Sequence, residues 1–452
     1  MSSKTKTTAT KEEARSALVP KLRFPEFRGA KMWASEPMGE VYSFKGNNSL
    51  SRDKLNYVAG SVKNIHYGDI HTKFSTHFDI TKELVPFINE SEEGVVRDEN
   101  LCAEGDMIFA DASEDMADIG KSIEIVSLNG ERVASGLHTV LARRIGDRIA
   151  LGFGGHLFKS GWVRTQIQKE AQGAKVLGIS ANRMRNIRLP LPHAKVEQQK
   201  IAECLSSVDE LMAAQARKVD ALKTHKKGLM QQLFPREGET QPRLRFPEFQ
   251  NAGEWALKRV DEQGSVLAGK ALAANAPGPQ RPYLRTKNVL DGAIDLSDVL
   301  TMPMTDTEFT RFEILDGDVL LNEGQSLELV GRASIYRGEL GQRCAMQNAL
   351  LRFRAFASTS AEFAAQYFRQ CQKDGTFANV ATKTTSVAHL GSSRFSSLEL
   401  AWPTPAEQQR IAICLSSLDA LITAETQKHE ALKTHKKGLM QQLFPSPEEV
   451  AV

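Results

Sequence analysis

ALKTHKKGLMQQLFP occupies residues 221–235 and recurs, letter for letter, at residues 431–445. The similarity continues upstream, where EQQKIAECLSSVDEL starts at Glu197 and EQQRIAICLSSLDAL starts at Glu407. A repeat of this length and identity indicates that one structural unit is encoded twice. We therefore expect two copies of one fold in the chain.

A shorter repeat, LRFPEF, opens each half at residues 22–27 and 244–249. Between this opening motif and the long closing segment, the halves share only Lys-Asn, Gly-Asp-aliphatic and Gly-basic steps in the same order. Apolar and β-branched runs predict strands at residues 106–109, 123–126 and 319–321, and longer stretches predict helices at about 157–172 and 361–372. One mixed skeleton is thus expected to carry two different surfaces.

Length and composition limit the number of domains and the class of protein. At 452 residues, two or more hydrophobic cores are expected, and 41% hydrophobic with 25% charged residues is typical of a globular protein. No stretch approaches the roughly 20 apolar residues that span a bilayer, so we expect no membrane association and a cytoplasmic location. The 5 cysteines lack metal-ligand spacing, which argues against a disulfide framework or a zinc site. A net charge of +3 is too small to indicate a nucleic-acid partner by itself.

The closing segment of each half has the apolar spacing of a long helix built to pair. Two rows of a heptad pattern carry the residues expected to mediate helix pairing, which are Ile201, Leu205, Val208, Met212, Val219, Leu222, Ile411, Leu415, Leu418, Ile422 and Leu432. A single amphipathic helix usually packs on its own domain, but a helix of roughly 55 Å exceeds what a small domain covers. The two helices should therefore pair with each other, antiparallel, with a pseudo-two-fold axis between the halves.

Local signals place the ends of these helices. Each ends at Leu-Phe-Pro, because Pro235 and Pro445 cannot continue the hydrogen-bond ladder. Residues 404–407 of the second copy fit a capping box with proline at the first helical position, whereas Ala194 gives the first copy a less defined start.

The predicted fold class is α+β, with two similar mixed α/β recognition domains separated by two long antiparallel coiled-coil helices. The expected boundaries are a disordered tail at 1–20, a first domain at 21–196, a central helix at 197–235, a linker at 236–242, a second domain at 243–406, a C-terminal helix at 407–445 and a tail at 446–452.

A search for catalytic motifs finds none that is complete. Residues 264–271 match a phosphate-binding loop except at Ala271, which has no hydroxyl for magnesium. No histidine lies in a metal-binding arrangement, and the acidic stretch around Glu114, Asp115 and Asp118 is better interpreted as an exposed loop than as a metal site. We expect no catalytic residue, no metal and no bound cofactor in this chain.

Positive charge is concentrated at residues 159–188, where seven basic residues accompany a single acid, Glu170. Such a cluster binds phosphates, although a solvated surface is the alternative interpretation. The candidate DNA-binding residues, chosen as phosphate contacts or base readers, are Lys63, Asn64, Lys121, Lys159, Arg164, Lys175, Arg183, Arg185, Arg285, Lys287, Asn288, Arg332 and Lys383. The two Lys-Asn steps correspond to each other in the two halves. They are consistent with turn residues as well as with residues that contact bases.

The sequence resembles the specificity subunit of type I restriction-modification enzymes from about residue 22 to residue 445. The resemblance rests on LPLP at residues 189–192, followed by EQQKIA and LSSVD, and on the second EQQRIA with LSSLD. The resemblance implies that each variable segment is a target-recognition domain for one half of a bipartite DNA site, and that the long helices are a spacer. Because the two segments differ, the site is expected to be asymmetric.

The same resemblance implies partners that carry the chemistry. Two methyltransferase subunits would dock on the helices and use S-adenosylmethionine to modify adenine, and two motor-nuclease subunits would use ATP and magnesium to move along double-stranded DNA and cleave it. The main alternative is a stand-alone DNA methyltransferase or nuclease with an unrecognised site. A coiled-coil scaffold that never touches DNA is the weaker alternative.

Overall fold

The structure is a computed structural model that describes residues 18–271, 273, 276–383 and 387–446. The expected tails at 1–17 and 447–452 lie outside these residues. The expectation of disorder was wrong for the last residues of the first tail: Leu18 is only 6% exposed, and its carbonyl accepts a hydrogen bond from the Trp33 N–H at 2.9 Å. Burial of an apolar side chain in the first core orders this end of the tail.

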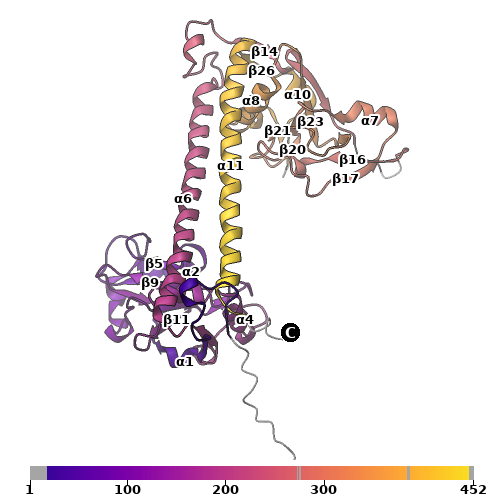
Figure 1. Cartoon of the computed structure of the whole chain (residues 1–452). Helices are drawn as coiled ribbons and strands as arrows, with labels where there is room; N and C mark the ends of the chain where they lie inside the picture. Colours follow the sequence, from indigo (N-terminus) through magenta and orange to yellow (C-terminus); the bar gives the residue numbers. More distant parts are fainter. Residues whose placement is uncertain (1–17, 272, 274–275, 384–386, 447–452) are drawn as a thin grey trace, which may run out of the picture. The chain divides into compact units, whose positions relative to one another are not determined.

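The chain divides into two compact units (Figure 1). Unit 1 comprises Met1–Gln215 and Lys428–Val452, and unit 2 comprises Ala216–Gln427. Two long helices, α6 at Lys195–Leu233 and α11 at Pro405–Leu443, each contribute residues to both units. Both helices end before Phe-Pro, because the residue preceding a proline is disfavoured in the helical conformation.

Unit 1 contains a five-stranded sheet in the order β2-β11-β7-β9-β5, which is antiparallel except for the β5–β9 pair. Its strands are β2 Tyr42–Lys45, β11 Thr139–Arg144, β7 Met107–Ala110, β9 Ser122–Ser127 and β5 His77–Asp79. A second sheet in the order β10-β4-β6-β3 is formed by Val133–Ser135, Lys63–Ile65, Phe87–Ile88 and Leu55–Asn56.

Two ribbons and five short helices complete the domain of unit 1. The ribbons pair β1 Ala34–Pro37 with β13 Arg188–Leu191 and β8 Ala112–Ser113 with β12 Leu177–Gly178. The helices are α1 Met38–Val41, α2 Tyr67–Thr72, α3 Phe153–Leu157, α4 Gly161–Glu170 and α5 Ala181–Met184. The helix expected at about 157–172 is α4, which begins only at Gly161 because Ser160 has an extended backbone.

Unit 2 is built on a related skeleton. Its sheets are β15-β23-β19-β21, formed by Gly264–Ala268, Leu350–Ala355, Val319–Asn322 and Ala333–Ile335, and β17-β16-β22-β18, formed by Leu300–Pro303, Gln280–Leu284, Cys344–Met346 and Glu313–Ile314. Smaller sheets join β20 Gly324–Gln325, β25 Ala388–His389 and β24 Thr382–Lys383, and β14 Ala256–Arg259 with β26 Glu399–Trp402. The helices are α7 Asp306–Phe312, α8 Ala361–Lys373, α9 Thr376–Val380 and α10 Ser392–Ser397.

Most of the secondary structure predicted from the sequence is confirmed. The strands expected at 106–109, 123–126 and 319–321 are β7, β9 and β19, and the helix expected at 361–372 is α8. The β7–β11 ladder of unit 1 recurs as the β19–β23 ladder of unit 2, and the parallel β10–β4 pair recurs as the β16–β22 pair. The shared Gly-Asp-aliphatic steps thus mark the same central strand in both units.

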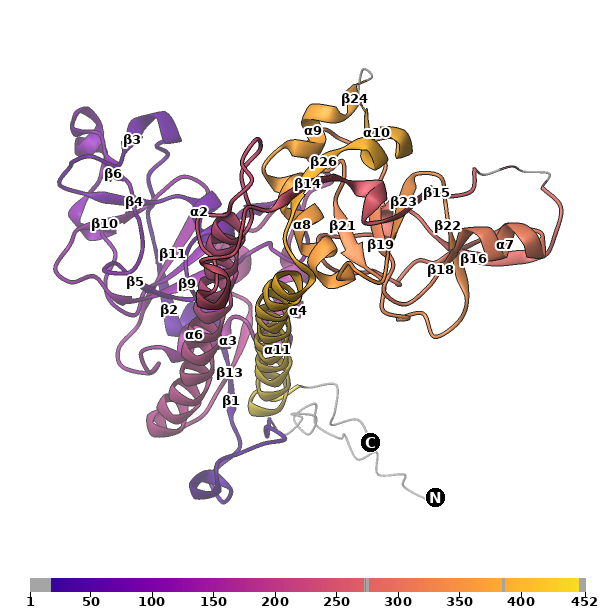
Figure 2. The ribbon, with the colours of Figure 1, turned by 90° about the horizontal axis from the view of Figure 1, so that it is seen from above.

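Each unit has a core that is completed by residues from both long helices. In unit 1, Ile201 and Leu205 near the start of α6 belong to one buried cluster with Leu443 and Phe444 at the end of α11. In the same unit α4 lies beside the end of α11 (Figures 1 and 2).

The core of unit 2 repeats this arrangement with the helices exchanged. Ile411 and Leu415 near the start of α11 are buried with Leu233 and Phe234 at the end of α6. The fifteen residues that are repeated at the two helix ends thus complete the same kind of core in each unit.

The opening motif joins the start of one long helix to the end of the other within each unit. In unit 1, the Arg23 guanidinium donates two hydrogen bonds of 2.7 Å to the Glu197 carboxylate, and the Leu22 N–H donates to the Gln442 carbonyl at 2.9 Å. The side chains of this ion pair are 7% and 1% exposed. The Arg23 guanidinium also donates to two backbone carbonyls, at 2.9 and 3.0 Å, so the buried charge is fully hydrogen-bonded.

Unit 2 contains the equivalent ion pair and backbone hydrogen bond. Arg245 donates to the Glu407 carboxylate at 2.9 and 2.6 Å, and the Leu244 N–H donates to the Gln232 carbonyl at 2.9 Å. The capping box expected at residues 404–407 is therefore only half formed. The Glu407 N–H donates to the Thr404 hydroxyl at 3.4 Å, but the Glu407 carboxylate binds the guanidinium instead of returning to the helix start.

Ion pairs also join the two long helices within each unit. In unit 1 the Lys436 ammonium lies 2.5 and 2.6 Å from the Asp209 carboxylate oxygens. In unit 2 the Lys226 ammonium lies 2.6 Å from both oxygens of Asp419, which also accepts from Gln366 of α8 at 2.8 Å. Among the described residues, no helix is long and apolar enough to cross a membrane.

The buried Arg245–Glu407 ion pair is expected to contribute strongly to the free energy of unfolding of unit 2. Glu407→Gln leaves Arg245 buried without an ionic partner, which should destabilise unit 2 by about 3–5 kcal/mol. Glu248→Gln is the matched control, because it removes an exposed ion pair with Arg410 and should have little effect on stability. Thermal melting of the full chain measures both, and equal melting temperatures for the two variants would contradict the assignment.

Candidate nucleic-acid interface

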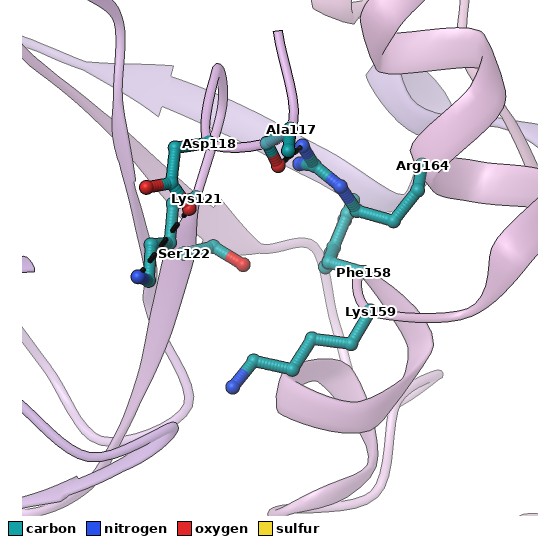
Figure 3. A pocket seen from close by; sticks show the side chains of 7 residues that line it. All are labelled: Ala117, Asp118, Lys121, Ser122, Phe158, Lys159 and Arg164. Carbon is teal, nitrogen blue, oxygen red and sulfur yellow. Dashed lines mark hydrogen bonds and ion pairs between the residues drawn. The ribbon is translucent and has the colours of Figure 1, made fainter. Parts of the chain in front are cut away.

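Three of the predicted cations meet at one cavity in unit 1 (Figure 3). The cavity has a volume of about 250 Å³ and is lined by Lys121, Lys159 and Arg164, with Asp118 at its rim. Lys121 directly precedes β9, Lys159 follows α3, and Arg164 lies on α4. Residues distant in the sequence therefore supply positive charge to one small space.

Backbone carbonyls hold the Arg164 side chain. Its guanidinium donates to the carbonyls of Ala117 at 2.9 Å, Ile119 at 2.7 Å and Gly120 at 3.2 Å. Carbonyl oxygens fix its orientation without neutralising its charge. Lys121 is held similarly, since its ammonium donates to a backbone carbonyl of α2 at 2.9 Å and lies 3.4 Å from Asp118.

The Lys159 ammonium is the most strongly perturbed cation of the cavity. It donates to the hydroxyl of Thr76, and desolvation by burial, followed by the positive charge of Lys436, lowers its pKa to about 8. Lys121 and Arg164 lower the pKa further, and Asp209 partly offsets these effects. The cavity thus concentrates positive charge that a phosphate would relieve.

The other cations predicted in unit 1 lie outside this cavity. Arg183 is paired with a glutamate at 3.2 Å, and Lys63 with a different glutamate. The Arg185 guanidinium lies 4.9 Å from the ring centroid of Phe44, and Lys175 is exposed. The basic window therefore does not form one continuous patch.

The cations predicted in unit 2 are more dispersed. Arg285 and Lys287 share the carboxylate of Asp298, at 2.5 and 2.8 Å. Arg332 donates to a backbone carbonyl at 3.1 Å, and Lys383 is exposed on β24. Arg332 follows the glycine that corresponds to the one before Lys121, so the Gly-basic step is the feature common to both units.

The two predicted asparagine readers are buried, and this part of the prediction was wrong. Asn64 is 0% exposed and accepts a hydrogen bond from Asn48 at 2.7 Å. Asn288 is 1% exposed, and its amide donates to the carbonyls of Asp295 and Asp298 at 2.8 and 3.1 Å. Neither amide is available to a base edge. The Asn64 side-chain oxygen and the Asn288 side-chain nitrogen are therefore both bonded within the fold.

The two Lys-Asn steps are also not structurally equivalent. Lys63 and Asn64 belong to strand β4, whereas Lys287 and Asn288 belong to a 3-10 turn that follows β16. Only the second pair fits the alternative interpretation as turn residues.

The sequence analysis missed a carboxylate that occurs at the same place in both units. Asp111 directly follows β7 and lies 3.3 Å from His138, and Glu323 directly follows β19 and lies 3.1 Å from His389. Each is the fifth residue after the aspartate of the Gly-Asp turn. That spacing was the available signal, but it is apparent only once the turns are aligned.

The partial phosphate-binding-loop match and the acidic stretch around Asp118 both have structural explanations. Gly264 to Ala268 form strand β15 rather than a loop before a helix, and Lys270 is paired with Glu308. Asp118 pairs with Lys121 at the cavity rim. Within the described ranges, no group of three or more histidine, cysteine, aspartate or glutamate side chains is arranged to hold a metal ion.

Residues 253–434 match the family described as type I restriction modification DNA specificity domain. The chain is 24% identical over 193 residues to the putative type I restriction enzyme MjaX specificity subunit of Methanocaldococcus jannaschii, covering 42% of this chain and 45% of that protein. It is 23% identical over 286 residues to the type I restriction enzyme EcoKI specificity subunit of Escherichia coli K12, covering 62% and 61%. The matched regions thus span less than two thirds of either relative.

Solved structures extend the likeness over nearly the whole chain. The type I S subunit from M. genitalium superposes with a TM-score of 0.56 at 12% identity, covering 95% of this chain and 100% of that one. A structure described under complex assembly and conformational transition of the type I R-M system gives a TM-score of 0.56 at 16% identity, covering 92% and 98%. The fold is therefore that of these subunits. The match of residues 253–434 and the fold are thus both similar to type I restriction-modification specificity subunits.

Proposed function

We propose that this chain binds double-stranded DNA and gives a type I restriction-modification complex its sequence specificity, without a catalytic centre of its own. The observation that carries the proposal is that two units share one skeleton but present different side chains. The cation-lined cavity of unit 1 supplies phosphate contacts, which position a protein on DNA.

Each unit reads one half of a bipartite site, and the half-sites differ. Support comes from the different placement of charge. Unit 1 gathers Lys121, Lys159 and Arg164 at one cavity, whereas unit 2 offers Arg285 and Lys287 beside a shared aspartate. Similar platforms with unlike side chains read unlike bases, so the target is asymmetric.

The helices α6 and α11 form an antiparallel coiled-coil spacer with a pseudo-two-fold axis. Each is 39 residues long, roughly 58 Å at about 1.5 Å per residue. In unit 1 the start of α6 shares a core with the end of α11, and in unit 2 the start of α11 shares a core with the end of α6. A stiff spacer of this kind fixes the number of unread base pairs between the half-sites.

The helices also dock two methyltransferase subunits, which supply S-adenosylmethionine chemistry on adenine. Leu211 and Leu421 occupy equivalent repeat positions, one on each helix, and are 58% and 41% exposed. Two equivalent apolar positions suit two copies of one partner. Two motor-nuclease subunits, with ATP and magnesium, complete the complex that cleaves DNA in the cytoplasm. This chain itself holds no cofactor.

Removing a cavity cation tests the phosphate contact. Lys159→Gln should weaken binding of the full chain to duplex DNA and reduce the slope of log affinity against log salt concentration by about one, without changing the preferred sequence. Lys82→Gln is the matched control, because Lys82 is an exposed lysine of the same unit, and it should leave the slope unchanged. Fluorescence anisotropy across a salt series measures both. Equal slopes for both variants and the unchanged chain would contradict the contact.

The lowered pKa of Lys159 predicts a pH dependence with a definite sign. A lysine with a pKa of about 8 is charged below that pH and loses its charge above it. DNA affinity should therefore fall by up to about 10-fold between pH 7 and pH 9 through this contact. Lys159→Arg keeps the charge and should remove this part of the fall. If the arginine variant loses affinity as steeply as the unchanged chain, Lys159 is not the titrating contact.

Lengthening the spacer should lengthen the unread gap. Four residues inserted in α6 between Val208 and Leu222, and four in α11 between Leu418 and Leu432, add about 6 Å, or roughly two base pairs. Methylome sequencing in a host that expresses the chain with its methyltransferase should show a longer gap and two unchanged half-sites. An unchanged gap would refute the spacer.

A further inference from the structure

Asp111 and Glu323 occupy the same place in the two units. Asp111 lies between the central strand β7 and the ribbon strand β8, and Glu323 lies between β19 and β20. In both units the preceding strand is buried along its whole length. The carboxylate is therefore mounted at the exit of a rigid strand.

The backbone of each acid is held on both sides by equivalent hydrogen bonds. The Asp111 N–H donates to the His138 carbonyl at 3.1 Å, and the Asp111 carbonyl accepts from Ile179 at 2.9 Å. The Glu323 peptide makes the same two bonds, both of 2.9 Å, with the residue before β23 and the residue after β25. A peptide fixed at both ends gives its side chain a constant direction, as a base-reading group requires.

Each carboxylate has a histidine beside it, but the histidine comes from a different element in each unit. His138 lies in the loop before β11 and has a positive φ of 54°, whereas His389 lies on strand β25. The imidazole Nδ1 lies 3.3 Å from the Asp111 carboxylate in unit 1 and 3.1 Å from the Glu323 carboxylate in unit 2. The two histidines do not occupy equivalent positions in the shared fold. The feature common to both units is therefore the acid–imidazole pair and not one conserved histidine position.

These pairs remain accessible. The side chains of Asp111 and His138 are 29% and 52% exposed, and those of Glu323 and His389 are 19% and 43% exposed. A contact between side chains at this exposure contributes little to stability. Holding the fold together is therefore an insufficient reason for the arrangement.

The surroundings are those of the predicted DNA contacts. In unit 1, Asp111 and His138 line an open depression of about 430 Å³ together with Arg183. In unit 2, strand β24, which carries Lys383, pairs with the strand that carries His389. Phosphates repel a carboxylate, so an acid among DNA-contacting cations is suited to base edges rather than to the DNA backbone. In the major groove, the base groups that donate to a carboxylate are the amino groups of cytosine and adenine.

We propose that Asp111 and Glu323 are specificity-determining residues, each accepting a hydrogen bond from the exocyclic amino group of one adenine or cytosine in its own half-site. The neighbouring imidazole holds the carboxylate in position and leaves an oxygen for the base. The inference rests on the proposed function and assigns a reader to each unit.

The test selects bound duplexes from a pool with randomised half-sites, using the full chain, Asp111→Asn and Glu323→Gln. Asp111→Asn should lower discrimination about 10- to 100-fold at one position of one half-site. Glu323→Gln should do the same at one position of the other half-site. Glu99→Gln is the control, because it removes one charge from an exposed acid of unit 1, and it should leave both half-sites unchanged.

The other half-site serves as an internal measure of folding, because a misfolded chain would lose both. Unchanged selection by both acid variants would overturn the inference while leaving the proposed function intact. Loss of affinity without a change of preferred base would also overturn it. If the unchanged chain selects no sequence, the proposed function fails first and the inference fails with it.

Discussion

The structure depends on a buried ion pair between the opening motif and the start of a long helix, Arg23 with Glu197 in unit 1 and Arg245 with Glu407 in unit 2. In each unit the peptide next to the arginine also binds a carbonyl near the end of the other long helix. Removing one partner would leave a charge in an apolar interior, which is far more costly than breaking an exposed pair. Opening motif, helix start and helix end therefore have to match one another, and these are the parts of the sequence that are repeated.

Outside this constraint the units are free to differ. The central ladder recurs, but the histidine beside the equivalent acid comes from a loop in unit 1 and from a strand in unit 2. Constant parts that fit each other and variable parts attached to them suit the proposed reading of two unlike half-sites. Side chains that are buried against the repeated helices are therefore constant between the units, and side chains away from them differ.

The repeated segments could be predicted from the sequence because their periodicity and identity reflect contacts with each other. The central strands were also predictable, since the Gly-Asp turns precede fully buried runs. Burial of Asn64 and Asn288 could not be predicted, because only the folded path of the chain brings Asn48 to Asn64 and the Asp295 carbonyl to Asn288. The same reason hid the Asp111 and Glu323 pairs, whose histidines come from separate elements. Lys121, Lys159 and Arg164 were individually predicted, but their convergence on one cavity depends on tertiary structure.

The most direct measurement is the map of methylated adenines in a host that expresses this chain with the proposed methyltransferase subunit. The proposed pair of unlike readers on a stiff spacer predicts one motif made of two different half-sites, separated by a constant number of unspecified base pairs. A single undivided motif, two identical half-sites, or a gap that varies from site to site would contradict the account.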